Sequence, residues 1–384
     1  FLHDGRPQLE LCATPPTATP VRPDPSPAGS LSAALIGILS SLNVCSKEWV
    51  IRQYDHEVQS GSVLKSLVGV HADGPGDACV IRPLLDSRRG LAVSNGINTL
   101  YGDLDPYWMA ASAIDEALRQ LVAVGAGLDR VALLDNFCWG SAFESENLWA
   151  LVQACKACHD MSLAYDAPFI SGKDSLNNFA QVEGRVISIP HTLLVSAMAV
   201  MPDVERVVSM DLKQPGDLLF VVGATYDELG GSEYGVYLGS SGGVVPRVRP
   251  ESGRPCMEAL SRAIEAGTVR ACHDMSEGGL AVAAAEMAFA GGLGATISIG
   301  AVPLGEAISR QDVVLFSESN SRFIAEVPAH LAPSFRSYFA GLPCAEVGVV
   351  EKEPLVRFTD TGGVPVLEAH VEELRAAWKR PLDW

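Results

Sequence analysis

Short apolar runs alternate with segments of helical periodicity along most of the chain. Two runs rich in β-forming and small residues, at 78–83 and 90–94, predict two strands of one sheet. The apolar spacing over residues 108–124 predicts a helix, and a second helix is expected to begin near Asn147. Strands and helices that alternate in this way are typical of α/β proteins, in which helices cover a sheet.

Two further apolar runs end in polar residues. The run at 130–134 predicts a strand that stops at Asp135 and Asn136, and the run at 168–170 predicts a strand followed by the polar loop 171–175. In α/β proteins, ligands bind beyond the carboxyl ends of the strands. We therefore expect a ligand site at this polar loop.

A second unit is expected to begin near residues 203–212. A turn at 214–217 leads into an apolar strand at 218–222, and two loops marked by paired glycines, 230–233 and 276–279, follow it. The second of these loops is predicted to open an alanine-rich helix from Leu280 to about Phe289. Short strands and helices alternate in the rest of the chain, so this unit is predicted to be α/β as well.

The predicted organisation has three parts. Residues 1–29 form a tail and a linker, because 13–27 are dense in proline and nearly free of large apolar side chains. A helical period begins at Ser30, so we assign residues 30–205 to a first domain and residues 206–375 to a second. A length of 384 residues favours two domains of ordinary size.

Composition and charge exclude several classes of function. The formal net charge of −18 without a run of Lys and Arg argues against nucleic-acid binding. The longest apolar stretches, such as 193–201, are far shorter than the roughly 20 residues of a membrane helix. The first residues do not resemble a signal peptide, and nine scattered cysteines favour reduced thiols, so we expect a cytoplasmic protein.

One cysteine pattern imitates a cofactor motif. Cys155, Cys158 and His159 match the attachment sequence of c-type haem, but they lie within residues 148–164, whose spacing predicts an amphipathic helix. Haem attachment also requires export. We therefore interpret the two cysteines as ordinary thiols on the flank of a helix.

The segment Gly172-Lys173-Asp174-Ser175 has the residue types of a nucleotide site. It combines a glycine that permits close approach, a fixed positive charge, a carboxylate and a hydroxyl, which suit a phosphate with its Mg²⁺. It is not a P-loop, because Ala167 and Asp174 stand where that motif needs Gly and Ser or Thr. The alternative is an ordinary polar turn.

Three other motifs leave two interpretations open. Asp135 could accept a hydrogen bond from a nucleotide or help to hold a metal, or it could cap the following turn. In residues 273–279 the loop before the helix could bind a phosphate, or Ser276 could be a simple N-cap. In residues 52–57 His56 could be a tuned base, although a cluster of structural ion pairs is favoured.

Several long motifs, in the correct order over residues 40–350, resemble the PurL subunits of the phosphoribosylformylglycinamidine synthase family. The motifs that carry this resemblance are residues 46–58, 102–110, 135–140, 171–178, 228–234 and 273–280. The resemblance implies an α/β (α+β) fold of the PurM-like, AIR-synthetase-like kind, in which an N-terminal α/β domain is followed by a C-terminal α/β domain.

The resemblance also implies an enzyme with several components. The chain is similar to the second of two such repeats, preceded by the tail of the first repeat at 1–7, and it ends at Trp384. The small form of the enzyme, which it resembles, has the glutaminase PurQ and the small subunit PurS as separate partners. With ATP and Mg²⁺, the family phosphorylates the amide oxygen of formylglycinamide ribonucleotide. Ammonia from glutamine then displaces phosphate to give the amidine.

Site residues carried over from the family fall on the polar loop and the strand before it. ATP contacts are implied at Asp135 and Gly172, and a substrate contact at Ser175. Lys173 stands where many small-form members have an asparagine that binds Mg²⁺, and a protonated lysine cannot ligate a cation. We therefore expect Lys173 to contact phosphate and Asp174 to bind the metal.

The catalytic histidine of the family lies in the first repeat, and residues 98–103 contain no histidine at the matching place. This half is therefore expected to contain no catalytic residue and to contribute ATP and substrate contacts to a site completed elsewhere. Two alternatives remain: a different ATP-dependent enzyme of the same superfamily, or a non-catalytic half that holds a nucleotide and supports the complex.

Overall fold

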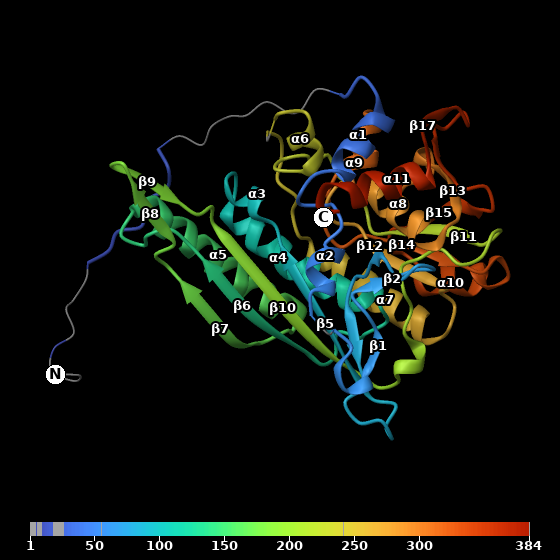
Figure 1. Cartoon of the computed structure of the whole chain (residues 1–384), viewed down its shortest axis with the longest axis horizontal. Coiled ribbons are helices and arrows are strands. Elements are labelled where there is room, and N and C mark those ends of the chain that lie inside the picture. Colours follow the sequence, from blue (N-terminus) through green and yellow to red (C-terminus); the bar gives the residue numbers. More distant parts are fainter. Residues whose placement is uncertain (1–4, 6–9, 18–26, 55, 241, 384) are drawn as a thin grey trace.

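The structure is a computed structural model that describes residues 5, 10–17, 27–54, 56–240 and 242–383. Most of the predicted tail 1–7 and the middle of the proline-rich linker lie outside the described residues. Two mixed sheets, each with helices packed against it, make up the described chain (Figure 1). The predicted class of mixed helix and sheet is confirmed.

Among the described residues, six strands form the first sheet, in the order β1-β4-β5-β10-β6-β7. Their bounds are β1 Ser62–Leu64, β4 Cys79–Ile81, β5 Gly90–Ile97, β10 Thr192–Met201, β6 Val131–Cys138 and β7 Phe169–Ser175. Neighbouring strands are antiparallel except β6 and β7, which are parallel. Both strands predicted at 78–83 and 90–94 are present.

Two boundaries predicted around the polar loop are wrong. Strand β6 does not stop at Asp135 but continues to Cys138, because β10 pairs with it through that residue. Residues 171–175 are not a loop, since they extend β7 alongside β6. Polar side chains on an exposed edge strand need no apolar environment on their outer side, so the polar composition misled the prediction.

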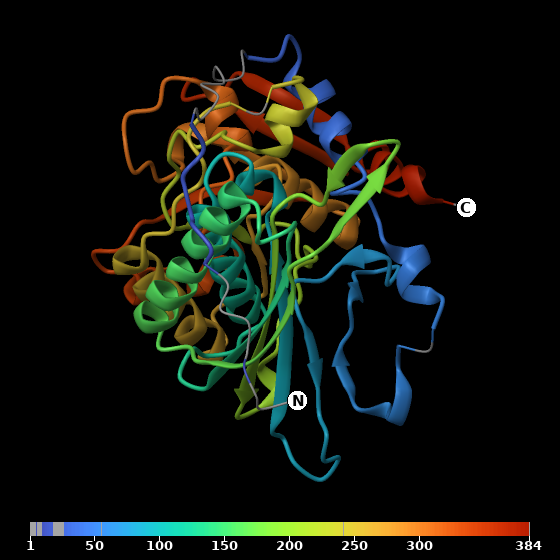
Figure 2. The same ribbon diagram turned by 90° about the vertical axis from the view of Figure 1, so that its left-hand side faces the viewer.

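Helices α4 (Pro106–Ala123) and α5 (Ser145–Tyr165) cover one face of this sheet (Figure 2). The prediction of a helix over 108–124 is confirmed. Asp105 caps α4 by accepting hydrogen bonds from the N–H groups of Tyr107 and Trp108, and Pro106 occupies the first helical position. The opposite face of the sheet exposes apolar side chains: Ile81, Val93, Ile97, Leu134 and Met198.

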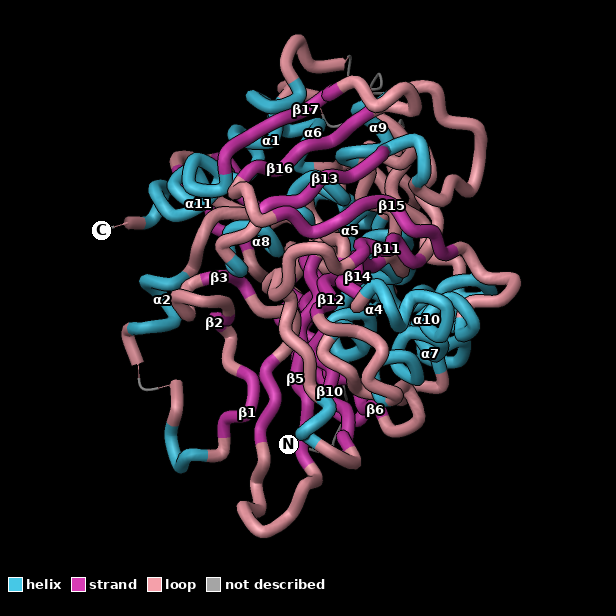
Figure 3. The backbone as a smooth tube through the Cα atoms, turned by 90° about the vertical axis from the view of Figure 1, so that its right-hand side faces the viewer, coloured by secondary structure: helices cyan, strands magenta, loops and turns pink. Residues whose placement is uncertain are grey.

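Seven of the described strands form the second sheet, in the order β12-β14-β11-β15-β13-β16-β17 (Figure 3). Their bounds are β12 Ala271–Asp274, β14 Phe323–Val327, β11 Leu218–Val222, β15 Cys344–Glu351, β13 Gly294–Ser298, β16 Leu355–Thr359 and β17 Pro365–His370. The strand predicted at 218–222 is confirmed.

Both faces of the second sheet are buried at β12, β14 and β11, whereas β17 exposes alternate residues. Phe220 and Val222 point into the core that contains α4, α7 (Pro250–Glu265) and α10 (Ala332–Tyr338). The alternate residues Leu219 and Val221 point into a second core with α8 (Gly279–Gly291), α11 (Val371–Lys379) and α1 (Leu31–Leu39). A strand with buried residues on both faces has a continuous apolar run, as β11 does.

The position of helix α1 differs from the predicted domain division. The expected helix after Ser30 is present, and the Ser30 hydroxyl accepts a hydrogen bond from the N–H of Ala33. However, Leu35 and Leu39 pack in the core of the second sheet, so α1 does not belong to the first domain as the range 30–205 implied. Sequence periodicity locates a helix but does not tell which core buries it.

The shorter elements connect these layers. They comprise the hairpins β2 (Leu67–Val68) with β3 (Gly74–Pro75) and β8 (Phe179–Val182) with β9 (Arg185–Ser188), and the helices α2 (Glu48–Arg52), α3 (Thr99–Gly102), α6 (Glu233–Tyr237) and α9 (Gln311–Phe316). Cys155, Cys158 and His159 lie on α5, as predicted, and all nine cysteines are free thiols. No described helix is long and apolar enough to cross a membrane.

Candidate functional site

The predicted site residues lie on β6 and β7, but they divide between two faces of the sheet. Asp135 on β6 lies opposite Gly172 on β7 in the parallel pairing of these two strands. Because side chains alternate along a strand, Asp174 lies on the same face as Asp135, toward α5, whereas Lys173 and Ser175 lie on the opposite face. The segment 172–175 therefore presents its side chains on two faces of the sheet, and the ligand contacts predicted for it stay predictions.

The carboxylate of Asp135 lies directly against the backbone of Gly172. A Cβ atom at position 172 would stand 2.5 Å from Oδ1 of Asp135, so the glycine permits this close approach. Burial raises the pKa of Asp135, the negative charge of Asp174 raises it further, and the backbone N–H of Lys173 partly opposes the rise. Two neighbouring carboxylates, such as Asp135 and Asp174, are the kind of oxygen ligands that a hard cation prefers.

On the opposite face, the ammonium group of Lys173 donates a hydrogen bond to the hydroxyl of Ser175. Lys173 is exposed, and no ion pair to it is found among the described residues. The ammonium group therefore remains available to an anionic ligand that approaches this face. Strand β7 is the edge of the sheet, so a ligand lying across that edge can reach both faces.

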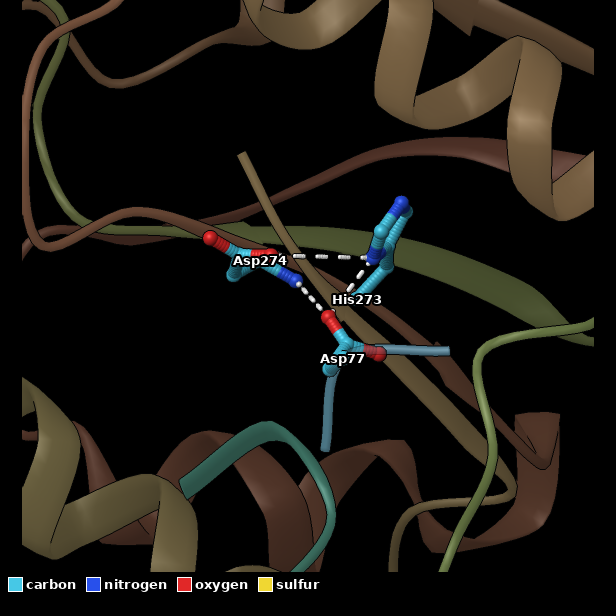
Figure 4. A group of neighbouring side chains, drawn as sticks. All are labelled: Asp77, His273 and Asp274. Atoms are coloured by element: carbon cyan, nitrogen blue, oxygen red, sulfur yellow. Dashed lines mark hydrogen bonds and ion pairs between the residues drawn. The ribbon is translucent and has the colours of Figure 1, made fainter. Parts of the chain in front are cut away.

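A second polar cluster lies where the two domains meet, and only part of it was noticed in the sequence. Asp77, before β4, meets His273 and Asp274 at the end of β12, and one ligand atom from each lies within 4.8 Å of the others (Figure 4). Oδ1 of Asp77 is 2.7 Å from Nδ1 of His273 and accepts a hydrogen bond of 2.9 Å from the N–H of Asp274. These donor atoms could hold a metal ion.

Helix α4 crosses this junction and is buried on nearly all sides, so its polar side chains must find partners in the interior. The Arg119 guanidinium donates to Asp274 at 2.7 Å, to Asp115 at 2.9 Å, to Asn320 at 3.1 Å and to Ser276 at 3.2 Å. A single buried cation thus binds α4 to the second domain.

In the loop before α8, a carboxyl group of the protein already engages one of the backbone N–H groups. Gly278, not Ser276, is the N-cap of α8, so the interpretation of Ser276 as a cap is wrong. The N–H of Gly278 instead donates 2.8 Å to the carboxyl group of Glu318, and the hydroxyl of Ser276 donates to Asp274. A carboxyl group of the protein thereby occupies the position expected for an anion.

Glu318 also accepts a hydrogen bond from the segment 98–103, which contains no histidine. The hydroxyl of Tyr101, from α3, donates 2.6 Å to Glu318. Burial raises the pKa of Glu318 to about 8, and burial likewise raises the pKa of Glu277 to about 7. Both carboxyl groups line a cavity of about 180 Å³, which shares Asn43 and Glu277 with a neighbouring cavity of about 170 Å³ beside Asp77.

Residues 52–57 are not part of either cluster. Arg52 pairs with Glu48 at 2.7 Å, and Lys65 pairs with Glu57 at 2.6 Å, both near the surface. His56 lies 3.7 Å from Glu57 and faces solvent, and Asp55 lies outside the described residues. The favoured interpretation, a set of structural ion pairs, agrees with this geometry.

Two domain families match the chain, each over one of its two units. Residues 75–190 match the AIR synthase related protein N-terminal domain, and residues 214–361 match the AIR synthase related protein C-terminal domain. The chain belongs to the AIR synthase related family. Both parts of the predicted tandem are thus present in this AIR synthase related chain, in the expected order.

Curated relatives are PurL subunits of phosphoribosylformylglycinamidine synthase. The AIR synthase related chain is 36% identical to that of Thermococcus sibiricus over 332 residues, which are 86% of this chain and 44% of the relative. It is 33% identical to that of Deinococcus radiodurans over 92% of this chain and 46% of the relative. The resemblance indicated by the sequence motifs is confirmed. The chain spans less than half the length of these relatives.

Solved structures of PurL from Thermotoga maritima share the fold. The complex with FGAR matches with a TM-score of 0.69 at 19% identity, covering 91% of this chain and 54% of that one. The complex with ATP gives 0.61 at 20% identity, with 82% and 48% covered. The structure of PurLQS gives 0.67 at 19% identity, with 93% and 53% covered.

Proposed function

We propose that the chain is the second-repeat half of a phosphoribosylformylglycinamidine synthase. In this proposal it takes part in the ATP-dependent conversion of formylglycinamide ribonucleotide, with ammonia from glutamine, to formylglycinamidine ribonucleotide. The observation that carries the proposal is the match to PurL along most of the chain, together with Asp135 held against Gly172 at the edge of the first sheet. The proposed setting is de novo purine synthesis in the cytoplasm.

The geometry of β7 supports a division of labour between its two faces. Asp135 and Gly172 would contact ATP on the side of α5, where Asp174 supplies a second carboxylate for Mg²⁺. Lys173 and Ser175 would contact the phosphate of nucleotide or substrate on the other side, where an ammonium group and a hydroxyl both offer hydrogen bonds to anionic oxygens. When bound, Mg²⁺ would neutralise the phosphate charge.

Other components would complete the site. The exposed apolar residues of the first sheet, among them Val93, Leu134 and Met198, form a face that soluble proteins ordinarily cover. The relatives are about twice as long as this chain, so their other half is the proposed occupant of that face. PurQ and PurS are proposed as the further partners, since a PurLQS complex is among the structures with this fold.

Calorimetry with Mg-ATP tests the nucleotide site directly. We expect saturable binding of Mg-ATP to the chain. Asp135→Ala should abolish this binding, because the substitution removes a carboxylate that faces the proposed nucleotide. Asp129→Ala is the matched control, since Asp129 is an exposed aspartate just before the same strand. No binding by the folded wild-type chain, or equal loss in both variants, would count against a preformed site in this half.

A non-catalytic role is the second candidate. It is favoured by the segment 98–103, which has no histidine and whose Tyr101 is engaged with Glu318. In that case the nucleotide would be held without turnover. Turnover by a complex reconstituted with the first repeat and the glutaminase, and lost on Ser175→Ala, would refute it; turnover unchanged by that substitution would support it.

A further inference from the structure

The last residue of β7 is held by the backbone of Trp139, which directly follows β6. The N–H of Trp139 donates a hydrogen bond of 2.8 Å to the carbonyl of Ser175, and the carbonyl of Trp139 accepts one of 2.9 Å from the N–H of Asn178. Both hydrogen bonds lie where the chain leaves the sheet for the hairpin of β8 and β9. The position of the Ser175 hydroxyl therefore depends on where Trp139 lies.

The indole of Trp139 is completely buried, and two neighbours fix its orientation. Its Nε1–H donates 2.9 Å to the backbone carbonyl of Asn147, in the first turn of α5. Its ring stacks on the imidazole of His191, with the ring centroids 4.6 Å apart and the planes inclined by 18°. His191 directly precedes β10, which pairs with β6, so the stack joins the ends of two neighbouring strands.

Asn147 also fixes the ring of His191. The amide nitrogen of Asn147 donates 3.2 Å to the carbonyl of Ser141, so its Oδ1 faces Nε2 of His191 at 3.1 Å. Burial lowers the pKa of His191, while the negative charge of Asp103 and a hydrogen bond with the backbone of Gly102 oppose the fall. The imidazole is therefore neutral at pH 7, and we assign its one N–H to Nε2, where Asn147 accepts it.

We propose that His191 is a positioning residue for the substrate contact at Ser175. It holds the indole of Trp139, and the backbone of Trp139 holds the end of β7. Asp135 and Gly172 lie earlier on the paired strands, where the ladder between β6 and β7 fixes them without the stack. This inference rests on the proposed function, because it takes Ser175 as a contact to the substrate.

Calorimetry on the complex reconstituted with the first repeat and the glutaminase tests this role. We expect His191→Ala to raise the Kd for formylglycinamide ribonucleotide roughly tenfold and to leave the Kd for Mg-ATP within about twofold, because only the misplaced contact is weakened. Asn147→Ala keeps both rings and removes the amide that holds His191, so about a threefold rise is expected. Phe339→Leu is the matched control. It weakens the buried ring pair with Phe335 in the second domain and should change neither Kd.

A double-mutant cycle separates positioning from general support of the fold. In Ser175→Ala the contact that His191 serves is gone, so adding His191→Ala should not raise the Kd for formylglycinamide ribonucleotide further. Additive effects of the two substitutions would overturn the proposal, and so would an equal rise in Phe339→Leu. If His191→Ala does not fold, Asn147→Ala takes its place in the same cycle.

The cycle also distinguishes this inference from the proposed function. A raised Kd in Ser175→Ala with an unchanged Kd in His191→Ala would refute only the role of His191. A Ser175→Ala variant with the Kd of the wild type would refute the proposed substrate contact, and the role of His191 with it.

Discussion

The two polar regions of this molecule use carboxylates in opposite ways. At the edge of the first sheet, Asp135 and Asp174 lie on and beside an exposed strand, where water reaches their carboxylates. At the domain junction, Asp115 and Asp274 share the buried guanidinium of Arg119. Water can compensate charge at the exposed edge, whereas at the junction the buried guanidinium of Arg119 does so. Substitutions should therefore impair binding at the edge and stability at the junction.

The largest expected effect follows from removing the buried cation. Arg119→Met leaves Asp115 and Asp274 buried without their partner, and such a loss costs about 3–5 kcal/mol of the free energy of unfolding. Urea unfolding followed by circular dichroism measures this cost.

Arg254→Met is the matched control for that substitution. Arg254 pairs with Glu258 at the same helical spacing as Arg119 with Asp115, but near the surface, where such a pair contributes about 0.3–0.5 kcal/mol. Similar losses in the two variants would mean that burial does not distinguish the regions as we argue.

The pH dependence of stability should sharpen the comparison, because burial at the junction favours the protonated form of a carboxyl group. Burial raises the pKa of Glu318 to about 8 in the folded chain, from about 4.5 in the unfolded chain. The stabilisation that protonated Glu318 contributes is fully present below pH 4.5 and is lost as the pH rises through 8. The free energy of unfolding should therefore fall between these values by up to about 1.4 kcal/mol per pH unit from this group.

Glu318→Gln isolates that contribution. The amide mimics the protonated carboxyl group, so the variant should lose less stability than the wild type between pH 6 and about 8. Glu258→Gln, at the surface, should leave the slope of the wild type unchanged. Urea titrations at several pH values supply the slopes, and a parallel wild-type and Glu318→Gln profile would show that Glu318 ionises normally.

Local sequence features predicted where several helices and strands lie. The arrangement of the side chains at the candidate sites depends on contacts between distant parts of the chain. The helix at 108–124 and the strand at 218–222 follow from periodicity and appear as α4 and β11. The segment 171–175 was assigned to a loop because polar residues and a glycine dominate it, yet backbone pairing with β6 makes it a strand. Which face each of its side chains takes depends on that pairing, so it could not be predicted from composition.

The junction cluster was missed for a related reason. Asp77 and His273 are separated by 196 positions, and no sequence spacing connects them. The motif at 273–279 was recognised, but its role was assigned to a helix N-terminus and not to contacts with α4. A signal was nevertheless present, since Asp115 and Arg119 lie within a mostly apolar helix, and charged residues there must pair in the interior.

The smallest effect on stability is expected at Gly172, an exposed residue of the edge strand of the first sheet. In Gly172→Ala the new methyl group meets the carboxylate of Asp135, which is half-exposed and can rotate away. We expect a loss of less than about 1 kcal/mol in the free energy of unfolding, together with loss of Mg-ATP binding in calorimetry. In Gly96→Ala the methyl group meets the backbone carbonyl of Ala113 in α4, which cannot move alone, so about 1–3 kcal/mol should be lost. Equal destabilisation of the two variants, or Mg-ATP binding retained by Gly172→Ala, would show that the close approach of Asp135 to the strand does not serve the ligand.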